Sequence, residues 1–178
     1  MQSRGESRIG YWIKNFKCPL WYALRRKYET FKTIIFMKTF KTIIFWFLSL
    51  TWGLPMTLMG AVVALALLIT GHKPKRFHHS IYFEVGENWG GFEAGGFFFT
   101  DKTPSLHTKQ HESGHGLQNI VLGPLMPFVV SIPSAIRYWY RRIKQKRNPN
   151  VVLPPYDSIW FEGQATRLGE KYFNEKQD

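Results

Sequence analysis

The segment His111-Glu112-Ser113-Gly114-His115 decides how the rest of this 178-residue sequence is interpreted. On a helix, two histidines four residues apart leave the same face one turn apart, so their ring nitrogens can bind one metal ion. Glu112 lies beside them. The turn signal Thr103-Pro104-Ser105 predicts that this helix starts near Ser105 or Thr108.

This His-Glu-x-x-His pattern is typical of zinc peptidases. Zinc lowers the pKa of a bound water to about 7 and polarises a carbonyl group, and a neighbouring carboxylate can accept the proton. The pattern therefore predicts His111 and His115 as metal ligands and Glu112 as the general base. Since Cys18 is the only cysteine, any further ligand must be His or a carboxylate. The alternative is a surface helix that carries two histidines by chance.

A third ligand is expected nearer the C-terminus. Residues 159–173 have the pattern of an amphipathic helix, with Glu162 at its start and Ala165 one turn later, where a small side chain permits close packing on the His-Glu helix. Asp157 is the alternative third ligand, as in the site-2-type intramembrane proteases, which also carry His-Glu-x-Gly-His. The prolines that follow His115 and the lack of an Asp-Gly pair favour Glu162.

With Glu162-Gly163-Gln164-Ala165-Thr166-Arg167-Leu168-Gly169, the first motif resembles the membrane gluzincin metallopeptidases of the HtpX and CAAX-prenyl-protease type. The resemblance covers these two short motifs. It implies an α+β minimal zincin that binds Zn²⁺ through His111, His115 and Glu162, with Glu112 as the base. Those relatives usually have Asp after the Ala, where it supports a histidine ligand. This chain has Thr166 there, and losing such support commonly lowers metal affinity or activity about 10- to 100-fold.

A second resemblance concerns location. The chain is similar to a set of bacterial membrane proteins with His-Glu-x-Gly-His and a later Gly-Pro-Leu, here Gly123-Pro124-Leu125. This similarity implies a place in the bacterial inner (cytoplasmic) membrane and brings no substrate with it.

Charge and hydropathy also favour a membrane. Residues 1–42 hold ten Lys and Arg against two acids, and no charged residue occurs from Thr42 to His72. This pattern predicts a basic cytoplasmic-type flank over 1–42, held by anionic lipid headgroups, and a transmembrane helix over 43–70. The apolar part is about 40 Å long as a helix, against roughly 30 Å of hydrocarbon, so a tilt or a kink at Gly53-Leu54-Pro55 is expected. Nucleic acid is not expected as a partner, because no nucleic-acid-binding motif is present.

Residues 71–178 are expected to form the zincin-like domain. Strands are predicted at 80–85 and 95–100, forming a β-hairpin or small sheet with Glu84 and Glu93 solvated. Prolines interrupt the second uncharged stretch, so a broken, membrane-associated segment is predicted over 116–140. A complete crossing there would put His111 and Glu162 on opposite sides of the membrane, so the segment is expected to be re-entrant. A polar loop is expected over 144–155. The side of the membrane that carries the site stays open.

The sequence therefore predicts a membrane-anchored minimal zincin that hydrolyses peptide bonds of protein or peptide substrates near the membrane. The alternative is a non-catalytic membrane protein with a structural or degenerate metal site. A structural site would be closed by four protein ligands, and His107, four residues before His111, is the obvious fourth. If it is not a ligand, His107 is expected either to support the site from outside or to be a solvated residue at the start of the helix. Met37, between two copies of Phe-Lys-Thr-Ile-Ile-Phe, is expected to be the translation start.

Overall fold

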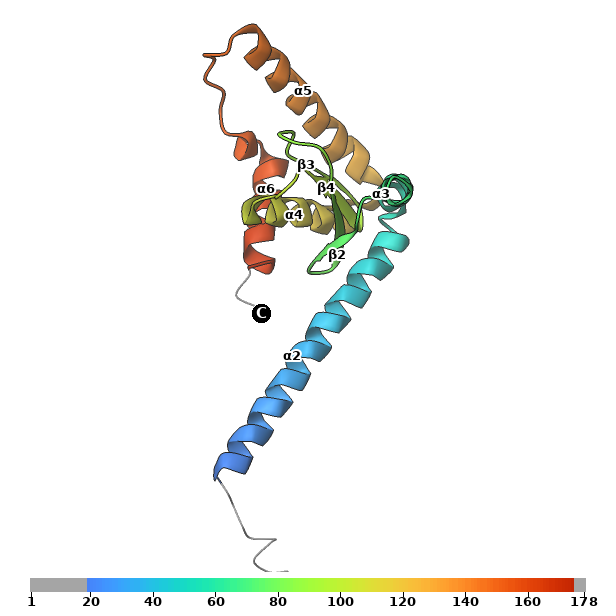
Figure 1. The fold of residues 1–178 in the computed structure, drawn as a ribbon, viewed down its shortest axis with the longest axis vertical. Helices are drawn as coiled ribbons and strands as arrows, with labels where there is room; N and C mark the ends of the chain where they lie inside the picture. Colours follow the sequence, from blue (N-terminus) through green and yellow to red (C-terminus); the bar gives the residue numbers. More distant parts are fainter. Residues whose placement is uncertain (1–18, 175–178) are drawn as a thin grey trace, which may run out of the picture. The chain divides into compact units, whose positions relative to one another are not determined.

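The structure is a computed structural model that describes residues 19–174 (Figure 1). It contains two compact units, Met1–Phe40 and Lys41–Asp178, and each is described by itself. Helix α2 (Pro19–Leu50) supplies the described part of the first unit and begins the second. The part of the predicted 1–42 flank that lies before Pro19 is outside the described residues, and the remainder is helical.

The predicted long apolar helix is two helices. α2 ends at Leu50 and α3 (Leu54–Ile69) begins after a short turn, with the two axes bent by 97°. Pro55 lies in the first turn of α3, where its missing N–H costs no hydrogen bond. The predicted break at Gly53-Leu54-Pro55 is thus confirmed, whereas a single kinked helix over 43–70 is wrong. In the described part of the chain no single helix is long and apolar enough to span a membrane, although two bent helix pairs meet that criterion together.

A four-stranded mixed sheet follows α3. Its strands are β1 (Lys75–Phe77), β2 (Ser80–Glu84), β3 (Gly91–Ala94) and β4 (Phe97–Thr100), in the order β1-β2-β4-β3. The predicted small sheet is confirmed, whereas the alternative, a hairpin of residues 80–85 with 95–100, is wrong because β2 and β4 pair in parallel. The glycine-rich segment between them contains β3, which pairs antiparallel with β4 through a tight turn at Gly95, where φ is +72°.

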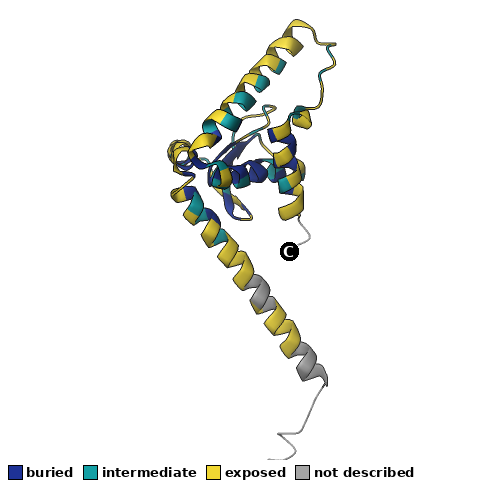
Figure 2. Cartoon of the chain, turned by 180° about the vertical axis from the view of Figure 1, so that it is seen from behind, coloured by how far each residue is buried: buried dark blue, intermediate teal, exposed yellow. Residues whose placement is uncertain are grey.

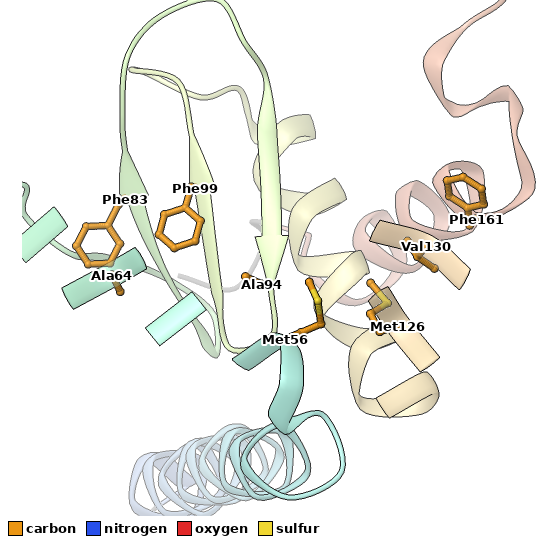
Figure 3. Packing of buried hydrophobic residues seen from close by; sticks show 8 residues of the cluster. All are labelled: Met56, Ala64, Phe83, Ala94, Phe99, Met126, Val130 and Phe161. Carbon is orange, nitrogen blue, oxygen red and sulfur yellow. The ribbon is translucent and has the colours of Figure 1, made fainter. Parts of the chain in front are cut away.

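The sheet is packed on both faces. Phe83 and Phe99 belong to a buried cluster with Met56 and Ala64 of α3 (Figure 3). Their neighbours along the strands point to the opposite face. There, Tyr82 and Phe98 form a second cluster with Phe77 and Phe173, packed against Leu106 and Leu117. This arrangement places α3 on one face and the site-bearing helices on the other.

Helix α4 (Leu106–Leu122) carries the His-Glu motif and begins as predicted. Its N-cap is Ser105, whose Oγ accepts a hydrogen bond of 3.0 Å from the Thr108 N–H. Helix α6 (Trp160–Tyr172) crosses it closely, because two glycines lie at the contact. A Cβ on Gly114 would be 2.0 Å from the Ala165 carbonyl oxygen, and one on Gly169 would be 2.0 Å from that of Gln110.

Gly114→Ala is expected to destabilise the protein by about 3 kcal/mol, because the added methyl meets backbone that cannot move without separating α4 from α6. Gly116→Ala on the same helix is the matched control. Its Cβ would meet the Phe45 ring at an ordinary 3.5 Å, so a neutral result or a gain of up to about 1 kcal/mol is expected from helix propensity. Denaturant unfolding measures both variants, and equal effects would contradict the close crossing.

The segment after α4 is broken, as predicted. α4 continues to Leu122, and a 3₁₀ turn (Gly123–Leu125) and a π-helical turn (Pro127–Ser131) lead into α5 (Ile132–Arg147), with a bend of 115°. The break thus begins at Gly123 and not at residue 116. Residues 144–147 are still helical, so the loop expected from 144 begins at residue 148. It ends in a 3₁₀ turn, Tyr156–Ser158, just before α6.

Candidate metal centre

The three predicted metal ligands lie together. His111 and His115 project from one face of α4, and Glu162 projects from the first turn of α6. Glu162 Oε2 is 3.1 Å from Nε2 of each histidine, and the two Nε2 atoms are 3.1 Å apart. One ligand atom from each residue lies within 4.8 Å of the others, so the three can hold one metal ion.

The second ring nitrogen of each histidine is also engaged. The Gln118 side-chain N–H₂ donates to the Phe161 carbonyl at 2.8 Å and to Gln164 Oε1 at 2.9 Å, which leaves Gln118 Oε1 as an acceptor. His115 Nδ1 lies 2.7 Å from that oxygen and therefore carries the proton. Its Nε2 lone pair is then free to face a metal ion. Sequence reasoning missed Gln118, although its position three residues after a ligand on the same helix could have indicated it.

Thr166 supports the other histidine. Its Oγ1 lies 2.9 Å from His111 Nδ1. A hydroxyl can accept a hydrogen bond from Nδ1–H and so orient the ring, as a carboxylate would, but it brings no charge. The position expected to support a ligand is therefore occupied by a weaker acceptor.

Changes at residue 166 should move zinc affinity in both directions. Thr166→Val removes the acceptor from His111 Nδ1 and is expected to weaken zinc binding about tenfold, whereas Thr166→Asp supplies a charged acceptor and is expected to strengthen it. Competition with a chromogenic chelator measures both constants. A loss of similar size in both variants would indicate that the residue matters for packing alone.

Glu162 is suited to a cation. Its side chain is fully buried, and its second oxygen, Oε1, accepts a hydrogen bond from Ser134 Oγ, which lies 3.0 Å from the Tyr156 hydroxyl. Burial alone would raise the pKa of Glu162, but its close contacts with the His111 and His115 rings lower it to about 2. Two imidazole nitrogens and one ionised carboxylate are the ligand set of an open zinc site, so the residues fit this metal.

The two alternative ligands lie outside the group. His107 is exposed, and its Nδ1 is 3.9 Å from Glu170 Oε1. Asp157 lies on the turn before α6. Both line the cavity in front of the ligand group. Among the described residues the ligand group has three members, which favours an open site over one closed by four protein ligands.

Glu112, the predicted base, lines the same cavity as the ligands. It is buried, and a Cβ on Gly91 would lie 2.3 Å from its Oε1, so the edge strand β3 approaches it closely. Burial raises the pKa of Glu112 to about 7, against the opposing effect of His111. A carboxylate with a pKa near neutrality is well matched to accepting and returning a proton.

The cavity in front of these groups has a volume of about 630 Å³. One wall is formed by strand β3 and the loop before it, which contains Trp89. The other wall is formed by the broken segment after α4 and the first half of α5. That second wall is largely apolar and includes Met126, Val130 and Trp139. The cavity is therefore large enough for peptide side chains and favours apolar ones.

The burial of Glu93 contradicts the prediction from the sequence. This residue was expected to be solvated, but it is only 5% exposed, and neither carboxylate oxygen has a side-chain partner in the described part of the chain. It lies on β3 and lines the cavity. Burial, together with the nearby charge of Glu112, raises the pKa of Glu93 well above its usual value. The alternation of β3 turns this side chain inward.

Glu93→Gln is expected to stabilise the protein at pH 8 by roughly 1 kcal/mol or more and to have little effect near pH 4. Folding raises the pKa of Glu93. The free-energy cost of ionising this buried carboxyl is therefore absent below the pKa of the unfolded chain and grows as the pH rises above it. Denaturant unfolding at the two pH values measures this. Glu87→Gln, which replaces an exposed carboxylate, is the control, and an equal gain for Glu93→Gln at both pH values would contradict the prediction.

Comparison with known proteins gives no assignment. No family model, curated protein or solved structure matches the chain. Any function must therefore be inferred from the residues of the site itself.

Proposed function

We propose that this chain is a zinc-dependent, gluzincin-like peptidase that acts on protein or peptide substrates at or near a membrane. The observation that carries the proposal is the convergence of His111, His115 and Glu162, with both ring Nδ1 atoms engaged and Glu112 beside them. Zinc supplies Lewis acidity and acidifies water, which are the requirements of amide hydrolysis.

The chain's own residues have separable tasks in this proposal. Glu112 accepts a proton from the attacking water and delivers it to the leaving amine. Ser134 holds Glu162 in place through Oε1. Strand β3 lies at the end of the sheet order, so its outer edge can pair with an extended peptide, whose side chains then enter the cavity.

The membrane part of the proposal has its own support. The apolar cavity wall comes from the broken segment after α4, which forms one of the two bent apolar helix pairs. A substrate with apolar residues at the cleavage site fits this wall, and such residues are abundant where a chain leaves a membrane.

Cleavage of a peptide library by detergent-purified protein tests the function. Products are expected from the zinc-loaded protein, to disappear with a chelator and to return with added zinc. If zinc raises the melting temperature but no peptide is cleaved, the alternative of a structural or degenerate site is favoured. The observation that supports this alternative is the uncharged Thr166 hydroxyl beside His111.

A further inference from the structure

The two helix bends of the second unit lie against each other. Trp52 Nε1, in the turn before α3, donates to the Val121 carbonyl oxygen at 3.2 Å. A Cβ on Gly123 would lie 2.3 Å from the same Nε1 atom, so the indole packs directly on this glycine. The bend at residues 51–53 and the bend at residues 123–127 are therefore joined.

Large apolar side chains are exposed where the bends meet. We name this surface the bend tip, and its residues, from 43% to 74% exposed, are Trp52, Leu54, Leu58, Val121, Leu125, Phe128 and Ile132. They come from both bends and carry no charge. Single exposed apolar residues are common, but a contiguous group from two segments marks a surface that is covered by a partner or a lipid.

Helix α3 extends this surface. Its buried stripe, which includes Met56, Gly60 and Ala64, packs on the sheet. The opposite stripe is equally apolar, with Leu58, Val62 and Ile69 among its exposed residues. In Figure 2 the exposed residues of α3 are yellow. A helix that is apolar all round, and has protein on one side only, needs an apolar medium on the other.

The packing of α3 sets its orientation in that medium. The sheet covers α3 along most of its length, from Met56 to Ala64. If α3 crossed the hydrocarbon, the strands would cross beside it, and the outer edge of β3 would leave backbone groups unpaired in lipid. Lying along the surface, α3 puts its outer stripe in lipid and keeps the sheet in water.

The charge of the chain indicates what kind of membrane surface this is. Within the second unit, residues 41–83 and 113–156 contain the two bends and hold ten Lys and Arg but no Asp or Glu. The rest of this unit holds five Lys and Arg against ten Asp and Glu, so its basic charge is concentrated in the segments that contain the bends. Basic residues that flank an apolar surface bind anionic lipid headgroups.

Helix α5 has the form of an interfacial helix. Ile132, Ile136, Trp139 and Ile143 recur every three to four residues and are all about half exposed or more. Its last turn is basic. Apolar, aromatic and basic residues in this order are typical of a helix that leaves the hydrocarbon through the headgroups.

We infer that the bend tip inserts into one leaflet of an anionic bilayer, with α3 lying along the membrane surface and α5 leaving through the headgroups. The occupant of the apolar surface is lipid. The inference rests on the membrane part of the proposed function and does not depend on zinc or catalysis.

Flotation with vesicles tests the surface. The full chain is expected to float with phosphatidylcholine vesicles that contain phosphatidylglycerol, and less well without it. Phe128→Glu and Leu125→Glu should each lower the partition coefficient about tenfold or more, since each puts a charge where an apolar side chain meets lipid. Val152→Glu is the matched control, because this side chain is 93% exposed in the loop after α5, and it should float as the wild type does. Equal flotation of all variants would contradict the insertion of the bend tip into the membrane.

Depth measurements test the orientation of α3. A fluorophore is attached to single cysteines at Leu58, Val62 or Ile69 in a Cys18→Ser background, and brominated lipids of known depth quench it. Similar, shallow depths at the three positions are expected. A Val62 probe at the bilayer centre, between two shallower ones, would overturn the inference and leave membrane association intact, whereas a wild-type chain that fails to float would remove the membrane part of the proposed function itself.

Discussion

Wild-type protein purified in detergent is expected to carry about one zinc ion per chain, and Glu162→Ala is expected to lose it. The substitution removes the carboxylate from the ligand group that the described residues form and leaves its two imidazoles. It also removes the acceptor of the partly buried Ser134 hydroxyl, which keeps only its contact with the Tyr156 hydroxyl among the side-chain contacts described. Since changes around metal ligands already cost about 10- to 100-fold in affinity, the loss of a ligand should exceed that range.

Metal analysis after dialysis against a weak chelator measures this loss. Glu170→Ala is the matched control, because Glu170 is an exposed acid on the same helix and lies near His107 rather than the ligand group. It should retain zinc. Zinc kept by Glu162→Ala but lost from Asp157→Ala would move the third ligand, and a wild type that binds no zinc even after reconstitution would contradict the metal centre.

The ligands could be predicted from sequence because a helix converts spacing into direction. His111 and His115 are one turn apart on α4 whatever surrounds them. Glu162 was harder to predict, because it lies on another helix and its distance from the histidines depends on how the two helices pack. Ala165 was the signal that the two helices come close, and in the structure its backbone lies against Gly114 of α4.

The sheet was less predictable, because strand pairing depends on chain reversals between strands. Two apolar runs separated by glycines favoured one hairpin. A short strand, Gly91–Ala94, is hidden among those glycines and reverses the direction of Phe97–Thr100. The burial of Glu93 follows from that missed strand, since alternation on β3 turns its side chain inward.

The role of Gln118 was harder to predict for a different reason. Gln118 orients His115 only because its amide is held by Phe161 and Gln164, both on the other helix. A residue three positions after a ligand has many alternatives on a surface helix. Its task is fixed by contacts that exist only after α4 and α6 have packed.

Glu112→Gln is expected to keep zinc and to lower peptidase activity by about 10²- to 10⁴-fold, the usual contribution of a general base. The amide has the same shape, so it fits against Gly91, but it cannot accept a proton. The measurement compares turnover and zinc content of the same preparations, with Glu87→Gln as a control at an exposed position outside the cavity. Glu112→Gln that cleaves as fast as the wild type would remove Glu112 from the chemistry. If neither protein cleaves any peptide while both hold zinc, the metal binds α4 to α6 as a structural element, since the same three ligands join these helices whether or not water reacts beside them.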